Sequence, residues 1–104
     1  MTYAIGDVVR VRSGRESGQL MRIVGISESF LLLANGKNRT VESPKRKSPK
    51  HVIAVMTRTD SETAMKLRRG ETIRNSELRR DLAMIGQEKA DKDQGGMQAW
   101  QKMI

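Results

Sequence analysis

The sequence has no cysteine, only three aromatic residues and no long apolar run, and each shortage excludes a class of protein. Without cysteine the chain forms neither a disulfide framework nor a thiolate metal site, so we expect a cytoplasmic protein. The longest apolar run, residues 30–34, is far too short for a membrane span, and the N-terminus lacks the apolar stretch of a signal peptide. Asp91 and Asp93 have no visible partners that would complete a metal site.

Catalytic residue types are also scarce. A serine or threonine nucleophile needs a neighbouring base, yet the chain has a single histidine, His51, and no G-x-S-x-G arrangement. Gly-rich and Walker-type phosphate loops are absent from the sequence as well. We therefore expect no enzymatic activity, no cofactor, no metal and no small-molecule substrate.

Positive charge is the strongest signal in the composition. The chain carries 20 Lys and Arg against 12 Asp and Glu, which gives a formal net charge of +8. Residues 1–52 hold ten basic and four acidic side chains, whereas residues 53–104 hold ten and eight. A field of this sign attracts polyanions, so nucleic acid is the expected class of partner.

The N-terminal half has the pattern of β-strands. In the run DVVRVRS, Val9 and Val11 alternate with Arg10 and Arg12, as expected of a strand with one buried and one wet face. The segment SGRESG at residues 13–18 consists of turn-forming residue types. We expect it to connect the first strand to a second one in a hairpin.

Further strands are predicted over residues 19–26 and 30–34. Asn35-Gly36 then offers two residues that tolerate the positive φ of a type I′ turn, which predicts a second hairpin between 30–34 and 37–42. The two prolines of PKRKSPK, residues 44–50, favour an exposed connection over a central strand or helix. A fifth strand is expected over residues 51–56, and five short strands suit a small antiparallel SH3-like barrel.

The C-terminal half changes to a helical period. Residues 59–62 have the T-x-x-E form of a capping box and Gly70 stands at a C-cap position, which predicts a short helix near 60–69. A second helix is predicted from the N-cap Asn75 to Gly86. Its apolar stripe, which we expect to pack on the barrel, consists of Leu78, Leu82 and Ile85.

The last eighteen residues resemble a linker and a tail. The stretch QEKADKDQGG at residues 87–96 is polar, alternately charged and ends in paired glycines, which is typical of a mobile connection. In the remaining residues 97–104, the apolar side chains either form one turn-spaced apolar edge or belong to a frayed or loosely docked end, and the second is the preferred interpretation. These apolar side chains are Met97, Trp100, Met103 and Ile104.

The stretch IGDVVRVRSGRESGQLMRIVGI resembles a KOW motif, with its Gly-Asp opening, alternating valine strand and two glycines four residues apart. The following block, LLANGKNRTVESPKRKSPKHV, is similar to small bacterial KOW-domain RNA-binding proteins related to the archaeal and eukaryotic large-subunit ribosomal proteins fourteen and twenty-seven. The resemblance covers roughly residues 3–53. Met21 stands where many KOW motifs have a third glycine, which points to the ribosomal-protein-fourteen-like branch rather than to transcription elongation factors.

The resemblance implies an SH3-like barrel that contacts structured ribosomal RNA, in a ribosome- or translation-associated ribonucleoprotein. We expect the barrel over residues 1–57, a helical extension packed on it over 58–86 and a mobile tail over 87–104. Ribosomal proteins are further possible partners. The candidate RNA-binding residues are Arg10, Arg12, Gly14, Arg15, Gly18, Lys37, Arg39, Lys45, Arg46, Lys47, Lys50 and His51.

Each candidate has a plainer interpretation. Arg10 and Arg12 suit the solvated face of any strand, and the two glycines either bring backbone amides to RNA or only satisfy positive φ in a turn. PKRKSPK also suits a solvated loop or a targeting signal, and His51 either bonds RNA or caps the preceding loop.

The arginines near residues 68–80, Arg79 and Arg80 among them, stand beside acidic residues including Asp81 and resemble a mixed-charge helix face rather than a second binding site.

The alternative function is a protein-protein interaction module of a ribosome or transcription assembly.

Overall fold

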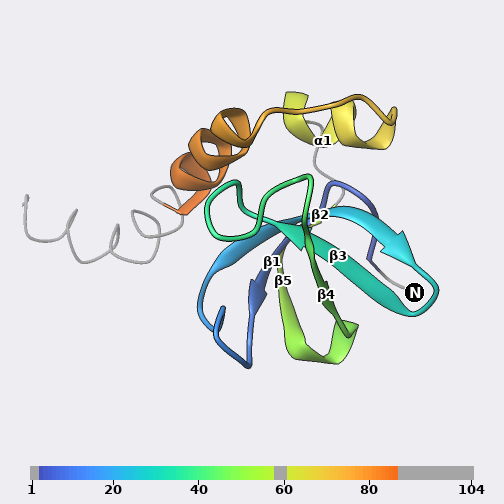
Figure 1. The fold of residues 1–104 in the computed structure, drawn as a ribbon, viewed down its shortest axis with the longest axis vertical. Helices are drawn as coiled ribbons and strands as arrows, with labels where there is room; N and C mark the ends of the chain where they lie inside the picture. The colour runs from blue at the N-terminus through green and yellow to red at the C-terminus, as the bar shows by residue number, and fades with distance from the viewer. Residues whose placement is uncertain (1–2, 58–60, 87–104) are drawn as a thin grey trace, which may run out of the picture.

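The computed structural model describes residues 3–57 and 61–86, which form one antiparallel sheet followed by two helices (Figure 1). The strand order is β4-β3-β2-β1-β5, so β1 to β4 pair consecutively and β5 returns to pair with β1. The predicted class, five antiparallel strands followed by two helices, is confirmed, but the fourth strand lies at 45–47 rather than at the predicted 37–42, and within the described residues no ladder joins the edge strands β4 and β5. The elements are β1 (Val8–Val11), β2 (Leu20–Ser27), β3 (Phe30–Ala34), β4 (Lys45–Lys47), the 3-10 helix η1 (Pro49–His51), β5 (Val52–Met56), α1 (Glu62–Arg68) and a second helix at 75–86.

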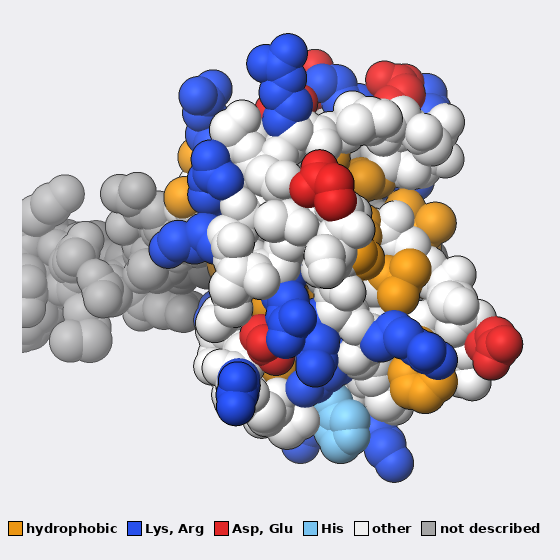
Figure 2. All heavy atoms as spheres, viewed as in Figure 1, with side chains coloured by type: hydrophobic (Ala, Val, Ile, Leu, Met, Phe, Trp, Pro, Cys, Tyr) orange, Lys and Arg blue, Asp and Glu red, His pale blue; other side chains and the backbone are white. Residues whose placement is uncertain are grey.

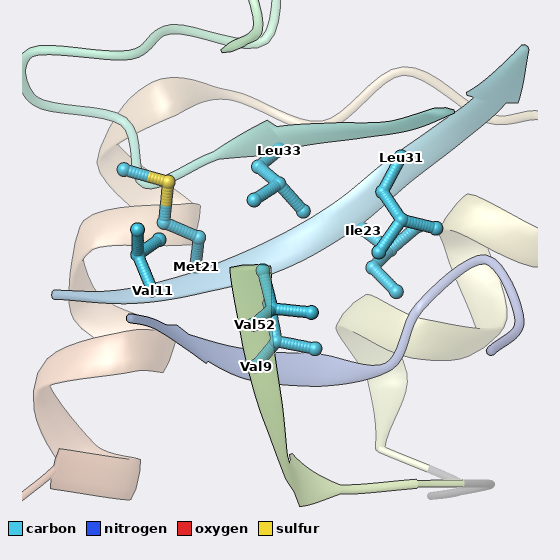
Figure 3. Packing of buried hydrophobic residues seen from close by; sticks show 7 residues of the cluster. All are labelled: Val9, Val11, Met21, Ile23, Leu31, Leu33 and Val52. Atoms are coloured by element: carbon cyan, nitrogen blue, oxygen red, sulfur yellow. The ribbon is translucent and has the colours of Figure 1, made fainter. Parts of the chain in front are cut away.

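One face of the sheet curves around an aliphatic core. Four strands contribute to it, so the sheet wraps around the cluster rather than lying flat (Figure 3). In β1, Val9 and Val11 point into this core while Arg10 is exposed, which confirms the predicted alternation. The core residues are Val9, Val11, Met21, Ile23, Leu31, Leu33 and Val52.

A second core lies between the sheet and the helices, which occupy the same side of the sheet (Figure 1). Val8 and Ala34 face this side of the sheet and pack against the predicted helical stripe. The stripe residues Leu78, Leu82 and Ile85 are 0%, 7% and 8% exposed, so their expected packing on the sheet is confirmed. Burial of such side chains stabilises the fold by about 1.5–3 kcal/mol each.

A buried arginine connects the sheet to both helices. Arg22 in β2 is 1% exposed, and its Nε and Nη2 atoms donate to the two carboxylate oxygens of Asp81 over 2.6 and 2.9 Å. Nη1 donates to the carbonyl oxygen of Gly6, and Nη2 also donates to the Ser61 hydroxyl at 3.2 Å. Ser61 is the N-cap of α1 and accepts from the amide of Ala64, so one guanidinium fixes the start of α1 and the position of the second helix.

The predicted hairpin at Asn35-Gly36 is wrong. Only Gly36 adopts positive φ, at +78°, and the segment that follows β3 forms turns with a single bridge between Thr40 and Ser43. The tight hairpin instead joins β2 to β3 through Glu28, whose φ of +55° supplies the left-handed residue. Asn35 does not form the predicted turn, because its side-chain oxygen accepts hydrogen bonds from the backbone amides of residues 37 and 39.

The exposed connection predicted for PKRKSPK is also wrong. Lys45–Lys47 pairs with β3 as the edge strand β4, and Pro44 lies immediately before it, where a missing amide proton breaks no ladder hydrogen bond. Pro49 begins the 3-10 helix η1, another position that needs no amide donor. The two prolines therefore bound the strand instead of preventing it.

The helix boundaries follow different caps from those predicted. Ser61, rather than Thr59, caps α1, and Gly70 with a φ of +76° follows its end as predicted. The first hydrogen bond of the second helix runs from the amide of Leu78 to the carbonyl of Arg74, so Asn75 lies inside the helix instead of capping it. Its side chain bonds the loop at residues 41 and 42.

The predicted linker and tail at 87–104, with Met97, Trp100, Met103 and Ile104, lie outside the described residues. The second helix includes Gly86, which is the last described residue, so the predicted end of this helix at Gly86 stays a prediction. Among the helices within residues 61–86, none is long and apolar enough to cross a membrane.

Replacing Asp81 by asparagine tests the buried network. The substitution Asp81→Asn keeps the shape of the side chain but leaves the Arg22 guanidinium buried without a counter-charge, so we expect the free energy of unfolding to fall by about 3 kcal/mol. The control, Arg80→Gln, changes an exposed neighbour on the same helix and should change stability by less than about 0.5 kcal/mol. Urea denaturation followed by circular dichroism measures both, and equal stabilities of the two variants would contradict the assigned role.

Candidate nucleic-acid interface

The sheet topology brings three basic segments together, at residues 10–18, 35–39 and 45–51. The Lys47 ammonium donates to the carbonyl oxygen of Ser13 at 2.9 Å, which joins β4 to the loop after β1. The amide of Arg12 donates to the carbonyl oxygen of His51 at 2.8 Å, which joins the same region to η1. Figure 2 shows basic side chains gathered with the histidine at the end of the molecule where β4 and η1 lie.

These three segments carry the entire net charge of the protein. Their 21 residues contain nine Lys and Arg and one carboxylate, Glu16, which gives a formal charge of +8. The rest of the chain holds eleven basic and eleven acidic residues and is neutral overall. Charge of one sign concentrated on adjoining segments produces a local field that a uniformly distributed charge does not. We call these segments the basic surface.

The loop at residues 13–18 is shaped by its glycines. Gly14 and Gly18 have φ values of +87° and +89°, so both adopt the positive φ that glycine allows in a turn. A side chain on Gly14 would also crowd the Lys47 ammonium, which lies 2.9 Å from the place of a Cβ atom. The carbonyl oxygen of Gly18 accepts from the Arg10 guanidinium at 2.7 Å.

The candidate cations divide into free and engaged side chains. Four are exposed and free of any side-chain hydrogen bond or ion pair with a described residue, namely Arg12, Arg15, Lys37 and Lys50; Lys45 forms none either, but it is half-buried and its charge acts on Glu16. Arg10 and Lys47 bond only to neutral carbonyl oxygens and so keep their charge, whereas Arg39 forms an ion pair with Glu16 at 2.9 Å.

Strand β4 separates its three cations between two faces. Lys45 and Lys47 lie opposite the buried residues Leu33 and Leu31, and directly opposed residues of an antiparallel pair share a face. Arg46 therefore lies on the other face, where its guanidinium stacks 4.5 Å from the centre of the Phe30 ring. All three cations belong to the basic surface, but Lys45 and Lys47 share the face of Leu31 and Leu33, whereas the exposed Arg46 stacks on Phe30 from the other face.

His51 is half-buried at the end of η1. Its backbone amide donates to the carbonyl of Ser48 at 3.0 Å, and its own carbonyl accepts from Arg12, so the residue helps to close the loop before β5. The imidazole forms no hydrogen bond with any described residue.

A hollow of about 1000 Å³ lies between the sheet, the 35–38 loop and the second helix. It is lined by three cations, Arg10, Lys37 and Arg79, and its described lining contains no carboxylate. The Arg79 guanidinium donates to the carbonyl oxygen of Gly36 at 2.6 Å, so this side chain contacts the 35–38 loop as well as solvent. We call this feature the cationic hollow.

Sequence reasoning missed most of the cationic hollow. It found Arg10, Gly18 and Lys37 as basic or turn residues, but Arg79 was interpreted as part of a mixed-charge helix face. Arg79 reaches Gly36 across 43 positions of the chain, and no local pattern carries that information. The amide side chains that line the hollow have no distinctive spacing either.

Within residues 3–57 and 61–86, no group of three or more His, Asp or Glu side chains is placed to hold a metal ion. No protein-family model matches the chain, and no curated protein matches it closely enough to indicate a relationship.

The Glu16–Arg39 pair makes stability depend on pH. Hydrogen bonding from the nearby Arg39 guanidinium is the main cause that lowers the pKa of the Glu16 carboxyl below its ordinary value of 4.5. Because the folded pKa is the lower one, the pair stabilises the protein fully above pH 4.5, and the contribution is lost as the pH falls through the folded pKa.

The variant Glu16→Gln isolates this contribution. We expect it to be less stable than the wild type at pH 7, because Arg39 loses its charged acceptor, and the difference should shrink as the pH drops below 4.5. Glu42, Glu71 and Glu77 also have lowered pKa values, but they are common to both proteins and cancel in the comparison. Urea denaturation of both proteins at pH 7 and pH 3 measures the effect, and a difference independent of pH would refute it.

Proposed function

We propose that the protein binds structured RNA through the basic surface. The observation that carries the proposal is that 21 residues on adjoining segments hold the whole net charge of +8. An RNA backbone is a dense line of negative charge, and each neutralised phosphate releases counterions, so such a surface gains affinity from every contact. The proposed fold is a KOW-type SH3-like barrel, which rests on the resemblance over residues 3–53 and is supported by the five antiparallel strands and by the pairing of β5 with β1.

The proposed mode is recognition of phosphates and shape. None of the 21 residues of the basic surface is Phe, Tyr or Trp, so it offers no platform for stacking bases. A-form RNA hides the base edges of its deep major groove, whereas its phosphates and 2′-hydroxyl groups remain accessible. Arg12, Arg15, Lys37 and Lys50 suit this task best, because phosphate binding breaks none of their bonds to described residues.

Ribosomal RNA is the proposed ligand, and the proposed setting is the cytoplasm, in association with ribosomes. The family resemblance supports this choice over other structured RNAs. Binding of a protein partner by the same domain would show itself as an association that survives nuclease treatment and is insensitive to salt.

Salt dependence tests the proposal. If about five phosphates are neutralised, the logarithm of the binding constant should fall with the logarithm of salt concentration at a slope of about −3.5 to −4.5. The double variant Arg15→Ala/Lys50→Ala removes two free cations, so its slope should be shallower by about 1.4–1.8. Fluorescence anisotropy with a labelled ribosomal RNA fragment at several salt concentrations gives these slopes.

The matched control is Arg74→Ala/Arg80→Ala. It removes the same charge from exposed side chains of the helical region, outside the basic surface, and should leave the slope within error of the wild type. Equal losses in both double variants would mean that only total charge matters, and the proposed surface would be wrong.

The Glu16→Gln variant should bind RNA more tightly while it is less stable. Loss of the carboxylate removes the one negative charge of the basic surface and frees Arg39 for phosphate, so the affinity should rise about threefold to tenfold at low salt. Anisotropy at 25 °C measures the affinity, and circular dichroism of the variant at the same temperature checks that it is folded. A decrease would contradict the role given to Arg39.

A further inference from the structure

The cationic hollow presents an organised set of hydrogen-bond donors. The guanidinium groups of Arg10 and Arg79 are held by the carbonyl oxygens of Gly18 and Gly36 at 2.7 and 2.6 Å. An arginine has five N–H donors, and for each of these two side chains a single bond to a described residue accounts for one of them. The acceptors are neutral, so both charges persist inside a concave surface that has no carboxylate in its described lining.

Two amide side chains add to these donors. The Asn35 oxygen accepts from the backbone amides of Lys37 and Arg39, so its nitrogen must be the donor to Gln19 and Asn38, at 2.8 Å each. Gln19 and Asn38 therefore use their oxygens toward Asn35, and their NH₂ groups have no acceptor among the described residues. Both side chains line the hollow.

The other part of the lining is apolar. Leu20, Leu82 and Ala83 contribute it from β2 and the second helix. A ligand that suits this lining carries acceptor atoms and negative charge on one side and a flat, poorly hydrated surface on the other. A phosphate alone satisfies only the cations, and a double helix is too wide to enter a concave site of this kind.

We propose that the cationic hollow takes one unpaired nucleotide of the bound RNA, with its phosphate on Arg10 and Arg79 and its base over Leu20 and Ala83. The inference rests on the proposed function and adds selectivity for RNA that has an unpaired nucleotide. The basic surface would bind the phosphates of paired RNA without regard to sequence, whereas the hollow favours RNA that carries a bulge or an unpaired loop residue, the usual targets of specific RNA recognition.

Three hairpin RNAs with paired stems of equal length test the inference, and each stem is closed by an ethylene-glycol linker so that no loop nucleotide is unpaired. One is fully paired, one has a single bulged uridine, and one has an abasic residue in the bulge. The wild-type protein should bind the uridine bulge about tenfold more tightly than the paired hairpin, and the abasic bulge should lose most of that gain, because it has no base to lie over Leu20 and Ala83.

Two pairs of variants on the second helix locate the effect. Arg79→Gln and Ala83→Glu alter the hollow, and each should reduce the tenfold preference to about twofold or less. Their controls, Arg80→Gln and Met84→Glu, make the same charge changes at adjacent exposed positions that are not among the lining residues, and both should keep the preference. The double variant Arg15→Ala/Lys50→Ala should weaken binding to all three hairpins equally.

A direct measurement covers the case in which a hollow variant is poorly folded. In the wild type, the side-chain NH₂ resonances of Gln19, which lines the hollow but lies outside the basic surface, should shift on addition of the uridine-bulge hairpin and not on addition of the paired one. Equal binding of the bulged and paired hairpins by the wild type, or unshifted NH₂ resonances, would overturn the inference and leave the proposed function standing. Failure to bind any of the three hairpins would overturn both.

Discussion

One buried guanidinium holds the two parts of this molecule together. Arg22 lies in β2 and satisfies its donors with the Asp81 carboxylate, the Ser61 hydroxyl and the Gly6 carbonyl oxygen. A buried charge is tolerated only when it is paired and hydrogen-bonded, so this network restricts where α1 begins and how the second helix crosses the sheet. The cationic hollow depends on the same restriction, because Arg79 lies two residues before Asp81 on that helix.

The elements that sequence reasoning predicted correctly are those whose environment is decided by near neighbours. Alternation identified β1 through Val9 and Val11, and helical spacing identified the stripe that packs on the sheet. The prediction failed where long-range contacts decide the conformation. Asn35 forms no hairpin, because its side chain organises a loop whose next residue, Gly36, packs so closely on the second helix that a Cβ atom there would collide with the carbonyl oxygen of Asn75.

The sequence predicted which residues belong to the candidate site, but not how their side chains are arranged and bonded. The twelve candidate residues fall in the three segments that the sheet brings together, because runs of cations and turn residues are visible locally. Which of them are free is not visible, since the ion pair of Arg39 with Glu16 spans 23 positions and the bond of Lys47 to Ser13 spans 34. No local sequence pattern indicated that Arg22 is buried, because one arginine among many in a basic chain is not distinctive.

In the proposed function, RNA lies on the basic surface rather than elsewhere on the protein. Ultraviolet crosslinking of the protein to RNA in cells, followed by mass spectrometry of the crosslinked peptides, tests that claim most directly. Crosslinks should concentrate in residues 10–18, 35–39 and 45–51. Crosslinks confined to α1 and the outer face of the second helix, or no crosslinked RNA at all, would contradict it.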